Sequence, residues 1–353
     1  LKQRIDRAFM TGFLQPAAMA DAAPMACRGC AAKLPAQPLA AALERVGLGG
    51  QPEDAAHLAG HPGLLQSMDG FPALVSDPWL NGRLTALHAC SDLWACGAKV
   101  SSAMATISLP MVSTDEQQEL LVQSLAGIRS VLDEQGAPLI GGHTMESRSA
   151  TPVPASLGVQ ITLTVNGSST SPWMKSGLRP GDALLISRPL GTGVLFAGAM
   201  TGATSARDLD TALQGMACSQ HTLLQQVEPV REGVHACTDI TGFGLLGHLG
   251  EMLESEPGLA IQLDGPAIPA YPGVFDLFDR GVSSTLAPSN RAAWRWLDGP
   301  VQLNQPPSAS LLELLVDPQT CGPLLLACTS AAAERLIQNG PWIQIGSATA
   351  AHG

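Results

Sequence analysis

The chain has 353 residues, more than one small hydrophobic core organises, so two domains are expected. Hydrophobic residues make up 45% of the sequence and charged residues 14%, a mixture that can bury a large core and excludes general disorder. The formal net charge of -11 argues against a nucleic-acid partner. It does not argue against a phosphate substrate, because a bound cation can reverse the local field.

The apolar runs and the cysteines indicate the cellular compartment of the protein. No apolar run reaches the roughly 20 residues that a membrane-spanning helix needs. The charged opening segment, residues 1–7, is not followed by the apolar core of a signal peptide. The eight cysteines are scattered through mostly apolar stretches, which is typical of reduced thiols. We therefore expect a cytoplasmic protein without a membrane partner.

Residues 1–24 are expected to lie outside the folded domains. They join a basic opening segment to a stretch rich in alanine and proline, which is the composition of a linker. A short docked helix over residues 1–14 is the alternative. The chain begins with Leu1 instead of methionine, which suggests a fragment or a processed product.

The segment Cys27-Arg-Gly-Cys30-Ala-Ala-Lys33 carries the first candidate chemistry. A Cys-x-x-Cys pair can be half of a zinc site, but zinc needs a second ligand pair, and the sequence has no other Cys-x-x-Cys. It can also be a redox dithiol, although such a pair normally follows a strand and this one follows an alanine-rich stretch. A third reading is a reactive Cys30 whose thiolate is favoured by the ammonium group of Lys33. The last alternative is a mobile loop with two idle thiols.

The first half of the chain alternates predicted strands with amphipathic helices. Ser113 and Thr114 are expected to cap the longest of these helices. Helices are predicted over residues 36–47, 83–96 and 115–135, and strands over residues 64–69, 100–109, 139–140 and 159–165.

Acidic residues stand where these predicted elements begin, end or return. The strand over 64–69 ends on Asp69, and the helix over 83–96 carries Asp92 back toward it. Asp54 lies in a turn-rich segment just before a probable strand. Carboxylates gathered in this way supply the hard oxygen ligands of a divalent cation. His88 and Asp92 lie one helical turn apart, and by themselves they predict an exposed polar couple.

Glycine-rich strand ends recur in both halves. Gly141, Gly142 and His143 follow the predicted strand at 139–140, where backbone N–H groups can approach phosphate oxygens. In the second half, strands are predicted over 183–187, 235–239 and 324–327, with glycine-rich turns at 189–193 and 241–248. The turn-forming residues 166–172 give the best boundary, so domains are expected over residues 25–170 and 171–353.

Each of these motifs is weak evidence alone, but the whole set in this order along the chain is specific for a protein family. They are Cys30-Ala-Ala-Lys33, Asp54-Ala-Ala, Asp69, Ser91-Asp92, Gly141-Gly-His143, Pro189-Leu-Gly-Thr-Gly193, Cys237-Thr-Asp239-Ile-Thr-Gly-Phe-Gly-Leu-Leu-Gly-His248 and Asp317-Pro-Gln-Thr320. This set resembles the selenophosphate synthetase (selenide, water dikinase) family over about residues 25–350. The run over 238–248 is the most specific part. It is shared within a superfamily that includes aminoimidazole ribonucleotide synthetase, thiamine-phosphate kinase and a thiocyanate-forming hydrogenase-maturation protein.

The resemblance implies a fold, a reaction and partners. The fold would be α+β, with two domains of the aminoimidazole ribonucleotide synthetase type, and a homodimer would form when the N-terminal domains pair their sheets. The enzyme would be a phosphotransferase that converts ATP, selenide and water into selenophosphate, AMP and phosphate with the help of Mg²⁺. ATP would lie between domains and subunits. The selenide would arrive free or from a selenium-delivery protein.

The resemblance also assigns roles residue by residue. It implies that Cys30 and Lys33 are catalytic and that Asp54, Asp92 and Asp239 bind metal. It implies nucleotide contacts from Lys33, Gln51, Pro52, Glu53, Asp69, Asp92, Gly141, Gly142 and His143.

Several positions depart from the family pattern. Ala32 stands where many relatives have a second cysteine, and His88 stands where many have asparagine. Cys321-Gly322-Pro323 replaces the usual Ser-Gly-Gly. Residues 1–14 look like the tail of a pyridine-nucleotide-disulfide-type oxidoreductase, to which some relatives are fused.

Two alternative functions are kept. The first is another ATP-dependent enzyme of the same superfamily, although the thiocyanate-forming relative would carry a C-terminal cysteine and this chain ends in Gly353. The second is a nucleotide-binding module without turnover that serves a fused redox partner. The presence of Cys30, Lys33 and the acidic residues argues against this module.

Overall fold

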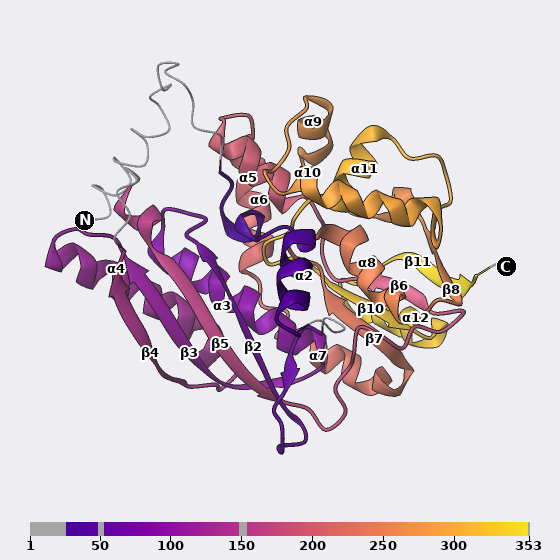
Figure 1. The fold of residues 1–353 in the computed structure, drawn as a ribbon, viewed down its shortest axis with the longest axis horizontal. Coiled ribbons are helices and arrows are strands. Elements are labelled where there is room, and N and C mark those ends of the chain that lie inside the picture. Colours follow the sequence, from indigo (N-terminus) through magenta and orange to yellow (C-terminus); the bar gives the residue numbers. More distant parts are fainter. Residues whose placement is uncertain (1–25, 49–52, 148–153, 352–353) are drawn as a thin grey trace.

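A computed structural model describes residues 26–48, 53–147 and 154–351 (Figure 1). Two β-sheets lie side by side, and each has helices packed against it. The expected α+β class is therefore confirmed. The expected linker over 1–24, with residues 51 and 52, lies outside the described residues. In the parts of the chain that are described, no helix combines the length and the apolar character needed to cross a membrane.

The N-terminal sheet has the strand order β1-β2-β5-β3-β4, and only the β3–β4 pair is parallel. Alternate residues of β5, among them Ile161 and Leu163, are buried in one core with α3 and α4. The bounds are β1 Ala56–His57, β2 Leu64–Pro72, β3 Lys99–Leu109, β4 Leu139–Glu146, β5 Gln160–Ser168, η1 Gly29–Ala32, α2 Ala36–Arg45, α3 Pro78–Ala95, α4 Thr114–Asp133 and η2 Ala155–Gly158.

The C-terminal sheet has the strand order β7-β10-β6-β11-β8-β9. Every residue of β6 and β10 is buried, because helices cover both faces at the centre of this sheet. The strands are β6 Ala183–Ile186, β7 Val234–Asp239, β8 Leu259–Leu263, β9 Val301–Leu303, β10 Leu324–Cys328 and β11 Ile343–Ala350. The helices are α5 Thr192–Met200, α6 Ala206–Ala217, α7 His221–Val227, η3 Glu228–Gly233, α8 Gly244–Glu254, η4 Gly265–Ala267, α9 Val274–Asp279, α10 Ala287–Asn290, η5 Arg291–Asp298, α11 Ala309–Val316 and α12 Ser330–Asn339.

Helix α3 joins the two halves. It contacts β2 and β5 of the first sheet and β7 and β10 of the second. Its residues Leu84 and Leu87 are buried in the same cluster as Cys237 and Leu326 of the second half. Because α3 has apolar contacts on both sides, few of its residues are exposed. The helix packs against both sheets and so connects them.

Most predicted elements are confirmed, and three local predictions are wrong. Strand β2 continues for three residues beyond Asp69, and α3 begins at Pro78, where the Asp77 side chain accepts a hydrogen bond from the Leu80 N–H at 3.0 Å. Residues 141–143 lie inside β4, not after it, because β4 pairs with β3 through Glu146. Strand β5 pairs with β2 and β3 as far as Ser168, so it takes up the first residues of the turn-forming segment 166–172, and the domain boundary after residue 170 stays a prediction.

Candidate active site

Three carboxylates from distant parts of the sequence meet between the two sheets. Asp54 precedes β1, Asp92 lies in α3, and Asp239 ends β7. Each offers one oxygen atom, and these three atoms lie within 4.8 Å of one another. The structure thus brings together the three residues that the sequence analysis assigns to a metal.

The electrostatics of this carboxylate cluster are unfavourable without a cation. Burial, with the nearby charge of Asp239, raises the pKa of Asp54 to about 7, although Lys175 opposes the shift. Burial and the charges of Asp239, Asp69 and Asp54 raise the pKa of Asp92 well above its usual value. The buried Oδ2 atom of Asp239 has no hydrogen-bond partner among the residues that the structure describes. Three carboxylates close together, one of them with a buried oxygen that lacks a partner, fit a divalent cation such as Mg²⁺.

Lys175 fixes one member of the carboxylate cluster. Its ammonium nitrogen lies 2.9 Å from Oδ1 of Asp54 and 2.8 Å from Oε2 of Glu251. The Thr238 hydroxyl also donates to Asp54 Oδ1, at 3.1 Å, and the backbone N–H of Lys175 donates to Glu53 at 3.1 Å. The role of Lys175 cannot be predicted from the sequence, because a single lysine just after a predicted boundary carries no local signal.

The segment that carries Cys30 is packed, not loose. Gly29 opens η1 with a φ of +64°, and a Cβ atom there would meet the Thr320 hydroxyl at 2.6 Å. That hydroxyl accepts a hydrogen bond from the Cys30 N–H at 3.0 Å. The Arg28 side chain donates to two carbonyl groups of the first half, at 2.8 and 2.7 Å, and the Cys30 side chain is 5% exposed. Residues 26–33 are therefore packed against both halves in this structure.

Lys33 points its positive charge into the same region. Burial lowers its pKa, but the charges of Asp69, Cys30, Asp92 and Asp239 outweigh burial, so the pKa is raised. Its ammonium nitrogen lies 5.4 Å from the centre of the Phe243 ring. A Cβ atom at Gly242 would meet Lys33 Cδ at 3.1 Å, so the glycine lets the lysine approach the loop after β7.

Asp69 and His88 form a buried pair beside Cys30. Nε2 of His88 lies 3.1 Å from Oδ2 of Asp69 and 2.8 Å from the Cys30 sulfur. Burial raises the pKa of Asp69, but His88 and Lys33 outweigh burial and lower it. The prediction of an exposed His88–Asp92 couple is wrong, since His88 is 1% exposed and Asp92 accepts a hydrogen bond from Ser67.

The predicted nucleotide contacts do not all converge in one chain. Gly141–His143 lie in β4, which is separated from β2 by β5 and β3. Because neighbouring strands lie about 4.8 Å apart, these residues are roughly 14 Å from Asp69 across the sheet. Glu53 lies near the carboxylate cluster through its bond to Lys175. Gln51 and Pro52 lie outside the described residues.

Residues of two motifs, the run over 238–248 and Asp317-Pro-Gln-Thr320, hold loops next to the site. Nε2 of His248, in α8, accepts a hydrogen bond at 3.1 Å from the N–H of Thr241 in the preceding loop, which fixes the turn after Asp239. Oε1 of Gln319 accepts hydrogen bonds from the N–H groups of Gly191 and Thr192 at the start of α5. These residues hold the loops in place and need not touch a substrate.

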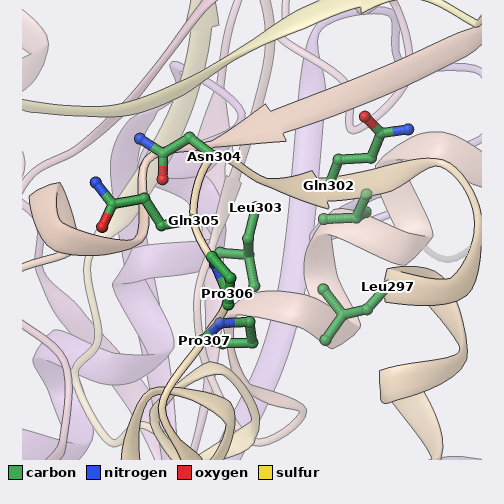
Figure 2. Close-up of a pocket in the computed structure, with 8 residues that line it drawn as sticks. Leu297, Gln302, Leu303, Asn304, Gln305, Pro306 and Pro307 are labelled. Atoms are coloured by element: carbon green, nitrogen blue, oxygen red, sulfur yellow. The ribbon is translucent and has the colours of Figure 1, made fainter.

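A separate pocket on the second half lacks the groups needed for this chemistry. It has a volume of about 560 Å³ and lies beside β9 and η5 (Figure 2). Its lining holds no acid, base or thiol: Leu297, Val301, Gln302, Leu303, Asn304, Gln305, Pro306 and Pro307. The carboxylate cluster with Cys30 and Lys33 is therefore the candidate site.

Comparisons with protein families and curated relatives agree with this site. Residues 52–167 match the AIR synthase related protein N-terminal domain, and residues 179–351 match the corresponding C-terminal domain. The chain is 30% identical over 325 residues to a selenide, water dikinase of Bdellovibrio bacteriovorus, with 88% of each chain covered. It is 32% identical to a selenide, water dikinase of Pelobacter propionicus, with 87% of this chain and 83% of the relative covered.

Solved structures share the fold at low sequence identity. Thiamine monophosphate kinase from Aquifex aeolicus superposes with a TM-score of 0.63 at 14% identity, covering 89% of this chain and 94% of that one. Hydrogenase maturation protein HypE in complex with ATP gives a TM-score of 0.58 at 18% identity, covering 99% and 86%. These likenesses show the fold and leave the substrate to be argued from the residues.

Proposed function

The chain belongs to the selenide, water dikinase family and is a phosphotransferase, and from this premise we propose that it makes selenophosphate from selenide, ATP and water, releasing AMP and phosphate. The observation that carries the proposal is the meeting of the three carboxylates with Cys30 and Lys33. Phosphoryl transfer depends mainly on charge neutralisation and in-line positioning. A buried site with both acidic and basic groups supplies both.

The carboxylates would hold the cation. Asp54, Asp92 and Asp239 are the proposed ligands, and the unpaired Oδ2 atom of Asp239 is the observation that favours them. Mg²⁺ bound there would neutralise phosphate charge during transfer. Lys175 keeps Asp54 oriented through its 2.9 Å contact, so this ligand is held in position before any substrate binds.

Lys33 and Cys30 would act on the two reacting partners. The Lys33 ammonium group lies near Asp69, the proposed nucleotide contact, and near Asp92 and Asp239, the proposed cation ligands. From there it can pair with a phosphate oxygen of the bound nucleotide. Cys30 is proposed to position the selenide for attack on the γ-phosphoryl group. The remaining ADP would be hydrolysed in the same site to AMP. The selenide could come free or from a delivery protein.

We infer a homodimer that completes the nucleotide site. Within one chain, Gly141–His143 lie on the far edge of the N-terminal sheet from β2. The same sheet exposes large apolar side chains, among them Met68, Met104 and Ile140. Pairing of two such sheets would cover these residues and bring the β4 edge of one subunit toward the carboxylates of the other.

The experiment that tests the function is an assay of nucleotide products with and without selenide. We expect AMP and phosphate to form only when selenide and Mg²⁺ are both present. Cys30→Ser should abolish selenide-dependent AMP formation while the protein stays folded and binds ATP.

Other outcomes identify the alternatives. Phosphorylation of a small-molecule acceptor with ADP as the end product would place the chain among other enzymes of the superfamily. ATP binding without any turnover would leave a nucleotide-binding module. Normal turnover of Cys30→Ser would remove the thiol from the reaction.

A further inference from the structure

His88 lies beside Cys30 but has no role in the reaction proposed above. It lies in the middle of α3, buried, with its ring 5.5 Å from the ring of Phe71. Its Nε2 atom lies 2.8 Å from the Cys30 sulfur and 3.1 Å from Asp69 Oδ2. A cysteine, a histidine and an aspartate are thus joined through a single ring nitrogen.

The other ring nitrogen fixes where the hydrogen sits. Nδ1 of His88 accepts a hydrogen bond from the backbone N–H of Cys321, at 3.4 Å. A backbone N–H can only donate, so in the neutral ring Nδ1 offers the lone pair and the hydrogen lies on Nε2; a protonated ring carries a hydrogen on Nε2 as well. The alternative tautomer would set two N–H groups against each other. It would also turn the Nε2 lone pair toward the carboxylate of Asp69.

The groups around His88 favour a hydrogen on Nε2: burial lowers the pKa of His88, but Cys30 and Asp69 outweigh burial and raise it well above its usual value. The Asp69 carboxylate and the Cys30 sulfur face Nε2, with the positive charge of Lys33 close to both. The Cys321 thiol does not compete, because it donates to the Leu84 carbonyl at 3.2 Å. The Nε2–H group faces both the Asp69 carboxylate and the Cys30 sulfur, and a thiolate accepts a hydrogen bond from it better than a neutral thiol does.

We propose that His88 is a positioning residue that holds the sulfur of Cys30 as a thiolate through its Nε2–H group, with Asp69 orienting the ring. When the thiol ionises, its proton passes to solvent and the electron pair stays on sulfur, where the His88 N–H and the Lys33 ammonium stabilise it. This inference rests on the proposed function only for the reaction in which the thiolate takes part. The ionisation itself needs no selenide and no ATP.

Two substitutions separate hydrogen bonding from packing. The amide nitrogen of glutamine reaches about the position of Nε2, so His88→Gln keeps a donor for Cys30. The shorter side chain in His88→Asn reaches only about the position of Nδ1 and loses that donor. The exposed His61 provides the matched control, His61→Asn.

The measurement is the pH titration of the thiolate ultraviolet absorbance, with the titration of the same protein carrying Cys30→Ser subtracted. We expect His88→Asn to move the midpoint up by about 1–2 pH units, the effect of one hydrogen bond to a charged group. His88→Gln should move it by less than about half a unit, and His61→Asn should not move it. Selenide-dependent AMP formation by His88→Asn should fall about tenfold at neutral pH and recover at higher pH.

The proposal is overturned if His88→Asn and His88→Gln shift the midpoint equally, or if neither shifts it. Nitrogen NMR of the unsubstituted protein gives a test that does not depend on a variant folding. It must show a hydrogen on Nε2 of His88, and a neutral ring with the hydrogen on Nδ1 would end the proposal. If the protein makes no AMP, the proposed function fails, whereas both of these measurements still decide the role of His88.

Discussion

Replacing Asp92 by asparagine should make the metal-free protein more stable and should weaken its binding of the Mg²⁺–nucleotide. Asp92 lies within 4.8 Å of carboxylate oxygens of Asp54 and Asp239. At that distance, and with an effective dielectric constant of ~20, one pair of full negative charges costs about 3.5 kcal/mol. Partial protonation and the nearby Lys175 reduce this cost, so we expect Asp92→Asn to raise the free energy of unfolding by about 1–3 kcal/mol without metal.

The pH dependence has a definite sign. The pKa of Asp54 is raised to about 7, and that of Asp92 is raised well above its usual value. Between the unfolded pKa near ~3.9 and these raised values, the native state holds protons that the unfolded chain has lost. The stability of the metal-free protein should therefore fall as the pH rises from about 4 through about 7. Asp92→Asn should make this fall shallower.

The assay is urea unfolding at pH 5.5 and pH 8, in EDTA and in Mg²⁺, followed by titration calorimetry with Mg²⁺ and a non-hydrolysable ATP analogue. Mg²⁺ should stabilise the unsubstituted protein, and Asp92→Asn should bind the Mg²⁺–nucleotide at least tenfold more weakly. The control is Asp133→Asn, which removes an exposed partner of Arg129 and should change stability by less than about 0.5 kcal/mol. If Asp92→Asn destabilises the protein in EDTA, or binds the nucleotide normally, the carboxylates are not the mutually repelling cation site described here.

The other predictions test the supports of the site. Lys175→Met leaves Asp54 and Glu251 buried without their shared cation, so unfolding by urea should show a loss of about 3–5 kcal/mol; a loss below about 1 kcal/mol would show that the pairing matters little. Thr320→Val removes the acceptor of the Cys30 N–H, so hydrogen exchange of residues 29–32 should quicken and AMP formation should fall, whereas unchanged exchange would mean that other contacts hold η1. Cys30→Ser and His143→Ala should each be inactive alone, and after subunit mixing about a quarter of the sites should be intact. Continued inactivity of the mixture would argue against a site shared between subunits.

Much of the fold could be predicted from local sequence patterns. The apolar spacing of residues 115–135 and the Ser113 cap predict α4, and the Ser113 side chain accepts the expected hydrogen bond from Glu116 N–H. The alternation of apolar and polar residues predicts β3 and β5, because one face of each strand is buried. Strand ends were predicted less well. Glycine and aspartate usually mark a turn, but in β2 and β4 the pairing with neighbouring strands continues through them.

The candidate site could be predicted only in part, since its members are distant in sequence. Asp54, Asp92 and Asp239 were identified by the order of the motifs, not by any local spacing. Lys175 and Glu251 could not be found in this way, because a lysine that neutralises a buried acid looks in the sequence like any surface lysine. The burial of His88 cannot be predicted for a similar reason: helical spacing shows that it shares a face with Asp92, but does not show that β2, η1 and the segment of Cys321 cover it.

The chemistry of this protein depends on the packing of its two halves, because three important groups of the first half have hydrogen-bond or ion-pair partners in the second. The Cys30 N–H bonds to Thr320, the Asp54 carboxylate to Thr238 and Lys175, and the His88 ring to the backbone of Cys321. A change in the angle between the sheets would therefore alter the thiol, the proposed cation ligands and the imidazole together. Helix α3 carries both Asp92 and His88 and touches both sheets, so it links the state of the carboxylates to the environment of the thiol. Substitutions that loosen α3 should thus reduce cation binding and thiol ionisation in parallel, whereas substitutions at Asp92 or His88 should separate them.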